Sequence, residues 1–116
     1  MKVVKKFTFD SAHYLPNYVG KCKQLHGHTY TLEVIVDGAV NQDTGMVVDF
    51  HDIDFFVKSK ILPELDHHCL NDVVVNPTAE NVAVYRARKL KIKFKSVGIR
   101  LWETQTAYVE LNTGEV

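Results

Sequence analysis

The chain has 116 residues, of which 46% are hydrophobic and 24% charged, and its 14 basic residues balance its 14 acidic residues. These values are typical of one ordinary globular domain and exclude a disordered chain. The zero net charge gives no argument for a nucleic-acid or membrane partner. No apolar run approaches the roughly 20 residues that span a bilayer, and the N-terminus lacks the apolar segment of a signal peptide. We therefore expect a single cytoplasmic domain over residues 1–116.

The first predicted element is a β-strand over residues 3–15, where the side chains alternate in character. One face of this strand carries Phe7, Phe9, Ser11 and His13. His13 therefore ends an aromatic row, and its ring should enter the interior or a cleft. Turn residues follow, and the loop that they form carries Cys22 at its far end.

Residues 26–37 alternate in the same way and predict a second strand, with His26 and His28 on the same face. Two strands joined by a loop of about ten residues most simply pair antiparallel. In one register of that pair, His13 would meet His26 and His28. The sequence does not establish that register.

Two helices are expected in the middle of the chain. Asp49 is a suitable N-cap for the first, which Pro63 should end or kink. A polar loop over residues 65–72 follows. Thr78 is a suitable N-cap for the second helix, and Glu80 then lies in its first turn.

Residues 97–103 and 107–111 alternate again and predict two further strands, with Glu103 at the end of an apolar row. The order β-β-α-α-β-β favours an α+β domain with an antiparallel four-stranded sheet and both helices on one face. Such a sheet has two open edges, which promote association unless they are paired or covered. We therefore expect a homo-oligomer in which the sheet continues into neighbouring subunits and closes a barrel.

Half of the basic residues lie between Arg86 and Arg100. Cations are favourable near a helix C-terminus, so the simplest interpretation of this segment is a solvated face of the second helix. An anion-binding patch is the alternative, and a nucleic-acid site would require salt-dependent binding to DNA or RNA.

His13, His26 and His28 together indicate a zinc site. An isolated His-x-His pair is weak evidence, but a third histidine on a matching face favours a metal. Catalytic zinc takes three protein ligands, whereas structural zinc is closed by four. Cys22 leaves both alternatives open. As a fourth ligand it would close a structural site, and held off the metal it would be partly thiolate and able to remove a proton.

Two further carboxylates suit a catalytic site. Asp66 precedes His67, and a carboxylate beside an imidazole can fix its tautomer and support its protonated form. A loop solvated by its own polar side chains is the alternative for this pair. Glu103 could accept two N–H groups from a planar heterocycle, or it is simply the first exposed residue at a strand end.

Five motifs occur in order along nearly the whole chain: Phe9-Asp10-Ser11-Ala12-His13, Cys22-x-x-x-His26-Gly27-His28, Leu65-Asp66-His67-His68-x-Leu70-Asn71-Asp72, Pro77-Thr78-x-Glu80-Asn81 and Glu103-Thr104. Together they resemble the 6-pyruvoyltetrahydropterin synthase and 6-carboxytetrahydropterin synthase family. This resemblance implies a tunnelling fold, trimers that form a barrel, and usually a hexamer of two trimers. It also implies a zinc enzyme acting on 7,8-dihydroneopterin triphosphate.

The resemblance also implies a role for each matching residue. The zinc ligands would be His13, His26 and His28, with Cys22 as the general base and Asp66 with His67 as the proton relay. Glu103 would anchor the pterin, with Thr78 and Glu80 nearby. No nicotinamide or flavin is needed for an internal tautomerisation, which agrees with the absence of a Gly-x-Gly-x-x-Gly segment.

The spacing of three residues between Cys22 and His26 resembles the carboxytetrahydropterin synthases of the queuosine route. Lys23 beside the cysteine disfavours the folate branch, whereas Trp102 and Ala79 depart from many relatives near the expected pterin pocket. We expect formation of 6-carboxy-5,6,7,8-tetrahydropterin with release of acetaldehyde and triphosphate. The alternatives are 6-pyruvoyltetrahydropterin formation and a non-catalytic oligomeric domain with structural zinc.

Overall fold

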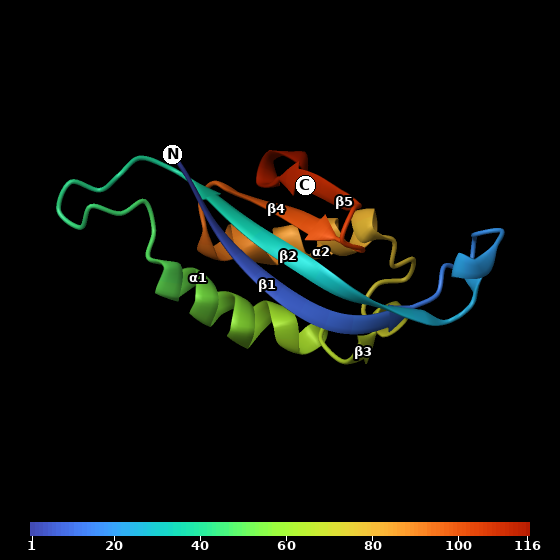
Figure 1. The fold of residues 1–116 in the computed structure, drawn as a ribbon. Coiled ribbons are helices and arrows are strands. Elements are labelled where there is room, and N and C mark those ends of the chain that lie inside the picture. The colour runs from blue at the N-terminus through green and yellow to red at the C-terminus, as the bar shows by residue number, and fades with distance from the viewer.

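The computed structural model describes all of residues 1–116 (Figure 1). The predicted order β-β-α-α-β-β is confirmed, and one short strand is added between the helices. The elements are β1 (Lys2–His13), β2 (His26–Asp37), α1 (Phe50–Phe56), β3 (His68–Cys69), α2 (Ala79–Lys93), β4 (Val97–Trp102) and β5 (Tyr108–Asn112). No helix has both the length and the apolar character needed to cross a membrane.

The sheet has the strand order β3-β1-β2-β4-β5. The four longer strands pair antiparallel, as predicted. The short β3 pairs parallel to β1 at Ser11 and Ala12, so the complete sheet is mixed and has five strands. A strand of two residues has no alternation to detect, so the sequence predicts a loop for this segment.

The register of β1 and β2 places His13 directly opposite His26, and Ser11 opposite His28. This is the register that a histidine cluster requires. It follows from the burial of one face, because a slip of one residue would turn the aromatic row of β1 toward the opposite face.

One hydrophobic core lies between the sheet and the two helices. In Figure 1, α2 lies behind β2 and β4, and α1 lies alongside β1. The buried side chains of both helices belong to the same cluster as the alternate side chains of the strands, among them Phe9, Tyr30, Leu32, Ile53, Ala83, Leu90 and Ile99. Both helices therefore cover one face of the sheet, here called the inner face.

The helix ends agree with the predicted capping residues. The Asp49 carboxylate accepts a hydrogen bond from the backbone N–H of His51 (2.8 Å), and the Thr78 hydroxyl accepts one from Asn81 (3.1 Å). Beyond α1 the chain continues as a π-helical turn over Val57–Ile61. Pro63 lies in a 3-10 turn that ends this helical segment, because it cannot donate a backbone hydrogen bond.

The basic segment that begins at Arg86 is not simply a solvated face. Arg86 is only 2% exposed, and its guanidinium Nη1 lies 2.6 Å from the Glu64 carboxylate, which also contacts Lys89 at 3.1 Å. At the other end of the segment, Arg100 contacts the carboxylates of Glu33 and Glu110. These ion pairs neutralise part of the basic charge and weaken the case for an anion-binding patch.

Candidate metal centre and active site

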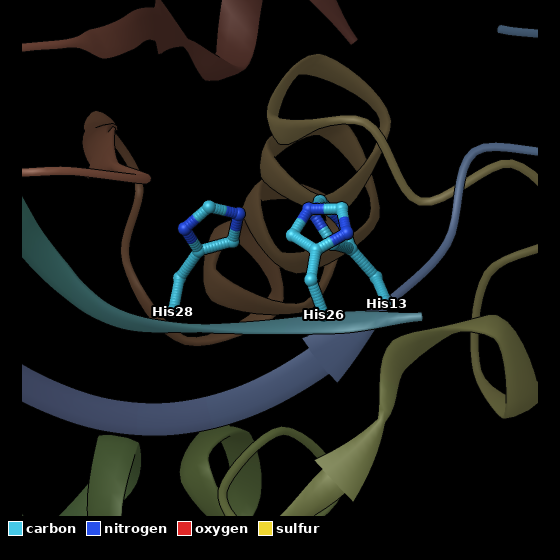
Figure 2. Close-up of side chains that lie close together, drawn as sticks. All are labelled: His13, His26 and His28. Carbon is cyan, nitrogen blue, oxygen red and sulfur yellow. The ribbon is translucent and has the colours of Figure 1, made fainter. Parts of the chain in front are cut away.

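Three histidines converge on the inner face, where β1 ends and β2 begins (Figure 2). His13 is the last residue of β1, His26 is the first residue of β2, and His28 follows two residues later on the same face. One ring nitrogen of each lies within 4.8 Å of those of the others. We call these residues the histidine cluster. The structure thus brings the three predicted side chains together.

The hydrogen bonds of two rings leave a nitrogen lone pair free for a metal. His13 Nδ1 lies 2.8 Å from the carbonyl oxygen of Pro77, and His26 Nδ1 lies 2.7 Å from that of Gln24. A carbonyl oxygen only accepts, so each Nδ1 carries a proton, and in the neutral form of each ring the lone pair then lies on Nε2. The two Nε2 atoms lie 3.0 Å apart. Neutral rings in these tautomers repel at that distance unless a cation lies between them, so the arrangement suits a metal.

His28 completes the cluster with a nitrogen that lacks a hydrogen-bond partner. Its Nε2 is buried and unpaired, and the Glu103 carboxylate 3.4 Å away does not have hydrogen-bond geometry. Burial lowers the pKa of His28 below its ordinary value of 6.5, and His13 and His26 lower it further, whereas Glu103 opposes the change. The ring is thus held neutral. Three imidazoles are a donor set that fits zinc with an open position.

Cys22 is not part of the histidine cluster. It lies in a 3-10 turn over Lys21–Lys23, in the loop between β1 and β2, and it is half-buried as a free thiol. Its carbonyl accepts a hydrogen bond from the backbone N–H of Leu15 (2.8 Å). The histidine cluster does not include the Cys22 sulfur, which favours the three-ligand alternative.

Asp66 and His67 are in contact, as an acid/base pair requires. The Asp66 carboxylate lies 3.0 Å from His67 Nδ1 and accepts a hydrogen bond from the backbone N–H of Asp10 (2.9 Å). The Asp10 N–H, with a further contribution from His67, holds the pKa of Asp66 below its ordinary value of 3.8. His67 has a φ of 57°, an uncommon conformation for a residue with a side chain. The Asp66 carboxylate is thus held ionised beside an exposed imidazole.

This pair lies on the other side of β1 from the second strand. Ser11 pairs with His28 of β2 on one side and with His68 of β3 on the other. A groove of about 570 Å³ is lined by His67 and His68 and also by His28. Asp10, Gly27 and Thr29 also line it, and they face away from the histidine cluster because they alternate with the inward positions of β1 and β2. The structure therefore places Asp66 and His67 near the strands that carry the cluster, but not in the cluster itself.

The predicted substrate-binding residues lie around the same end of the sheet. Glu103 directly follows β4, and its backbone N–H donates to the carbonyl of Ala107 (3.1 Å). Thr78 caps α2, and the carbonyl of the preceding Pro77 is the one that holds His13. Glu80 lies exposed in the first turn of α2. Of these three, Glu103 alone has a contact with a histidine of the cluster.

Several residues that shape the site were not among those predicted for it. The carbonyls of Gln24 and Pro77 set the tautomers of two histidines, but every residue type offers a carbonyl. The Asn71 carboxamide binds the backbone of Tyr14 through two hydrogen bonds. Asn71 belongs to the motif that runs from Leu65 to Asp72, and its place in that motif was the one sign in the sequence that it could matter for the site.

Comparison with known proteins finds relatives of one family along nearly the whole chain. The family model described as 6-pyruvoyl tetrahydropterin synthase matches residues 2–114. A 6-carboxy-5,6,7,8-tetrahydropterin synthase of Haemophilus influenzae is 35% identical over 136 aligned positions, covering 94% of this chain and 96% of the relative. A dihydroneopterin monophosphate aldolase of Pyrococcus furiosus is 34% identical over 116 positions, covering 95% and 96%. The solved 6-pyruvoyl tetrahydropterin synthase of Caenorhabditis elegans superposes with a TM-score of 0.82 at 27% identity, covering 96% and 94%.

Proposed function

The chain belongs to the 6-pyruvoyl tetrahydropterin synthase family, and we propose that it is a zinc-dependent lyase that converts 7,8-dihydroneopterin triphosphate to 6-carboxy-5,6,7,8-tetrahydropterin. One water would be consumed, and acetaldehyde and triphosphate would be the other products. The observation that carries this proposal is the convergence of three imidazoles beside the carboxylate of Glu103. Such a site combines a Lewis-acid position with a hydrogen-bond acceptor for a heterocycle.

His13, His26 and His28 would hold the zinc. When bound there, zinc supplies Lewis-acid chemistry that acidifies the hydroxyl groups and adjoining C–H bonds of the substrate side chain. Glu103 would orient the substrate by accepting N–H hydrogen bonds from the pterin ring. The N-terminal turn of α2, with Thr78 and Glu80, lies on the same side of the site as His13 because Pro77 holds that ring.

Two side chains would move the protons. The Cys22 thiolate would remove one from the substrate side chain, because a free, half-buried cysteine outside the ligand set is available as a base. His67 would return a proton, with the ionised Asp66 carboxylate supporting its imidazolium form. The separation of this pair from the histidine cluster by β1 supports a site that two subunits complete. We therefore include a homo-oligomer, a trimer or a hexamer of two trimers, in the proposal.

The queuosine pathway in the cytoplasm is the proposed setting. The support for this branch is the relative named 6-carboxy-5,6,7,8-tetrahydropterin synthase, together with the three-residue spacer before His26. Formation of 6-pyruvoyltetrahydropterin is the alternative within the family. A non-catalytic domain with structural zinc has less support, because it needs Cys22 as a fourth ligand.

A second candidate function is cleavage of dihydroneopterin monophosphate by an aldolase reaction. The alignment to the Pyrococcus furiosus aldolase spans 116 positions and covers 95% of this chain, so the two chains match with few insertions. The alignment to the Haemophilus influenzae synthase extends over 136 positions for a similar share of this chain, so it contains more gaps. An aldol cleavage also needs a base beside an activated hydroxyl group, which the same site offers.

The test is product analysis of the zinc-loaded protein with each substrate. Incubation with 7,8-dihydroneopterin triphosphate should give 6-carboxytetrahydropterin and acetaldehyde, identified by mass spectrometry. A 6-pyruvoyl product would select the first alternative, and cleavage of the monophosphate alone would select the aldolase. Recovery of both substrates unchanged would refute all three enzymatic functions.

A further inference from the structure

Asn71 completes the pairing of β1 with its side chain where the short strand β3 has ended. It lies in a 3-10 turn over Leu70–Asp72, directly after β3. The backbone N–H of Tyr14 donates to Asn71 Oδ1 (3.0 Å), and Asn71 Nδ2 donates to the Tyr14 carbonyl (2.8 Å). One carboxamide thus satisfies both backbone groups of one residue, as a neighbouring strand would.

The residue held in this way is the first of the loop that carries Cys22. Tyr14 follows His13, and the next residue, Leu15, donates its N–H to the carbonyl of Cys22 (2.8 Å). The connection from the Asn71 carboxamide to Cys22 therefore runs through Tyr14 and Leu15, with hydrogen bonds at both ends.

The rest of this loop has little else to hold it. Tyr18, Val19 and Leu25 are exposed, and no residue of the 3-10 turn around Cys22 is buried. Besides the Asn71 carboxamide, the one hydrogen bond that joins residues 14–25 to the remainder of the chain is that from the His26 ring to the Gln24 carbonyl. Asn71 is thus the attachment at the start of the loop, and His26 is the attachment at its end.

We propose that Asn71 is a positioning residue, which holds the Cys22 loop against the end of β1 and so sets the place of the thiolate relative to His13. This inference rests on the proposed function, because it gives Cys22 the role of the base. It assigns no contact between Asn71 and substrate.

The variant Asn71→Ala removes both hydrogen bonds to Tyr14 and leaves every histidine contact in place. His13 keeps the Pro77 carbonyl and its pairing with His26, so zinc binding should change less than about threefold. A base displaced by about 1 Å can cost up to about 100-fold in rate, so we expect kcat to fall by about 10-fold or more with little change in KM. Alkylation of Cys22 by iodoacetamide in the zinc-loaded protein should become several-fold faster, as followed by mass spectrometry of its peptide.

Two further variants test whether the effect on Cys22 comes from the hydrogen bonds between Asn71 and Tyr14. Asn71→Asp keeps an acceptor for the Tyr14 N–H but places a carboxylate against the Tyr14 carbonyl, so it should also accelerate alkylation of Cys22. Asn41→Ala is the matched control, because Asn41 Oδ1 accepts the backbone N–H groups of Asp43 and Thr44 in the turn at the opposite end of the molecule (Figure 1). It should leave Cys22 alkylation unchanged.

Two results would overturn the inference. One is an unchanged rate of Cys22 alkylation in folded Asn71→Ala, or in Asn71→Asp should the alanine variant not fold. The other is a loss of zinc that accounts for the whole loss of turnover, since that would make Asn71 a support for the metal site. Failure of the proposed function would be seen separately. In that case the protein without substitutions would leave both pterin substrates unchanged, while the alkylation rates would still report the position of Cys22.

Discussion

The carboxylate of Glu103 lies 3.4 Å from Nε2 of His28, at the point where β4 ends on the inner face of the sheet. This contact joins the residue proposed to bind the pterin ring to a residue proposed to bind the metal. Its geometry is not that of a hydrogen bond, so the carboxylate oxygens remain available to accept from a ligand.

The variant Glu103→Gln tests the role of this carboxylate. The amide keeps the shape but replaces one accepting oxygen with an NH₂ donor that opposes the pterin N–H groups. Hydrogen bonds to charged groups contribute about 1.5–3 kcal/mol, so we expect KM to rise by about 10-fold to 100-fold. Steady-state kinetics would measure this change, and metal analysis should show zinc retained. A loss of zinc with unchanged KM would contradict the assignment.

The lowered pKa of His28 predicts how zinc binding depends on pH. Zinc needs the neutral imidazole, and burial keeps His28 neutral below its ordinary pKa of 6.5. The unfolded chain binds this proton at higher pH than the folded chain, so the stability of the metal-free protein should fall as the pH drops below 6.5. Zinc affinity should decline over the same acidic range. Chelator competition between pH 8 and pH 5 would measure it, and a marked decline already between pH 8 and pH 7 would contradict the prediction.

The metal content of two variants separates a catalytic zinc site from a structural one. Cys22→Ala should fold and keep its zinc but lose turnover, because the sulfur lies outside the histidine cluster. His28→Ala removes a direct ligand, which should cost more than the about 10-fold to 100-fold in affinity seen for outer partners of metal ligands. Elemental analysis after dialysis measures both.

Cys69→Ser is the matched control for the cysteine variant, because Cys69 is also a free, half-buried thiol and serine keeps a donor for Asn71 Oδ1. It should keep both zinc and turnover. Loss of zinc from Cys22→Ala, with loss of folded structure, would instead support four ligands and a structural site.

The buried Arg86 predicts a large effect on stability far from the histidine cluster. Glu64→Ala leaves the guanidinium, which is 2% exposed, without its carboxylate. Breaking a buried ion pair costs about 3–5 kcal/mol, and partial exposure of Glu64 places this case nearer about 2–3 kcal/mol. Urea unfolding would measure the change in the free energy of unfolding. Lys89→Ala removes the second, half-buried cation that contacts Glu64 and should cost less than about 1 kcal/mol, so equal losses would contradict this explanation.

The alternation of side chains along the strands predicts only part of the sheet. The direction of a strand side chain depends on whether its position is odd or even, so the inward direction of His13, His26 and His28 could be predicted without a structure. Their meeting could not, because it depends on the register of β1 and β2. The short β3 was missed for a related reason, since two residues have no period.

The site was likewise only partly predictable from the sequence. Motif spacing identified the candidate site residues, including Cys22 and the Asp66 and His67 pair. It did not show that Cys22 lies outside the histidine cluster, or that β1 separates the pair from β2. Nor did it show that Arg86 is buried against Glu64, because a basic residue on a helix is usually solvated.

The sequence by itself determined the fold class, the order of the main elements and the set of candidate metal ligands. Those features depend on local periodicity and on capping and turn residues, which are properties of residues close together in the sequence. Only the tertiary structure decided the tautomers of His13 and His26 and the anchoring of the Cys22 loop by Asn71. These depend on single hydrogen bonds to backbone groups of distant segments, and backbone groups are the same for nearly every residue type.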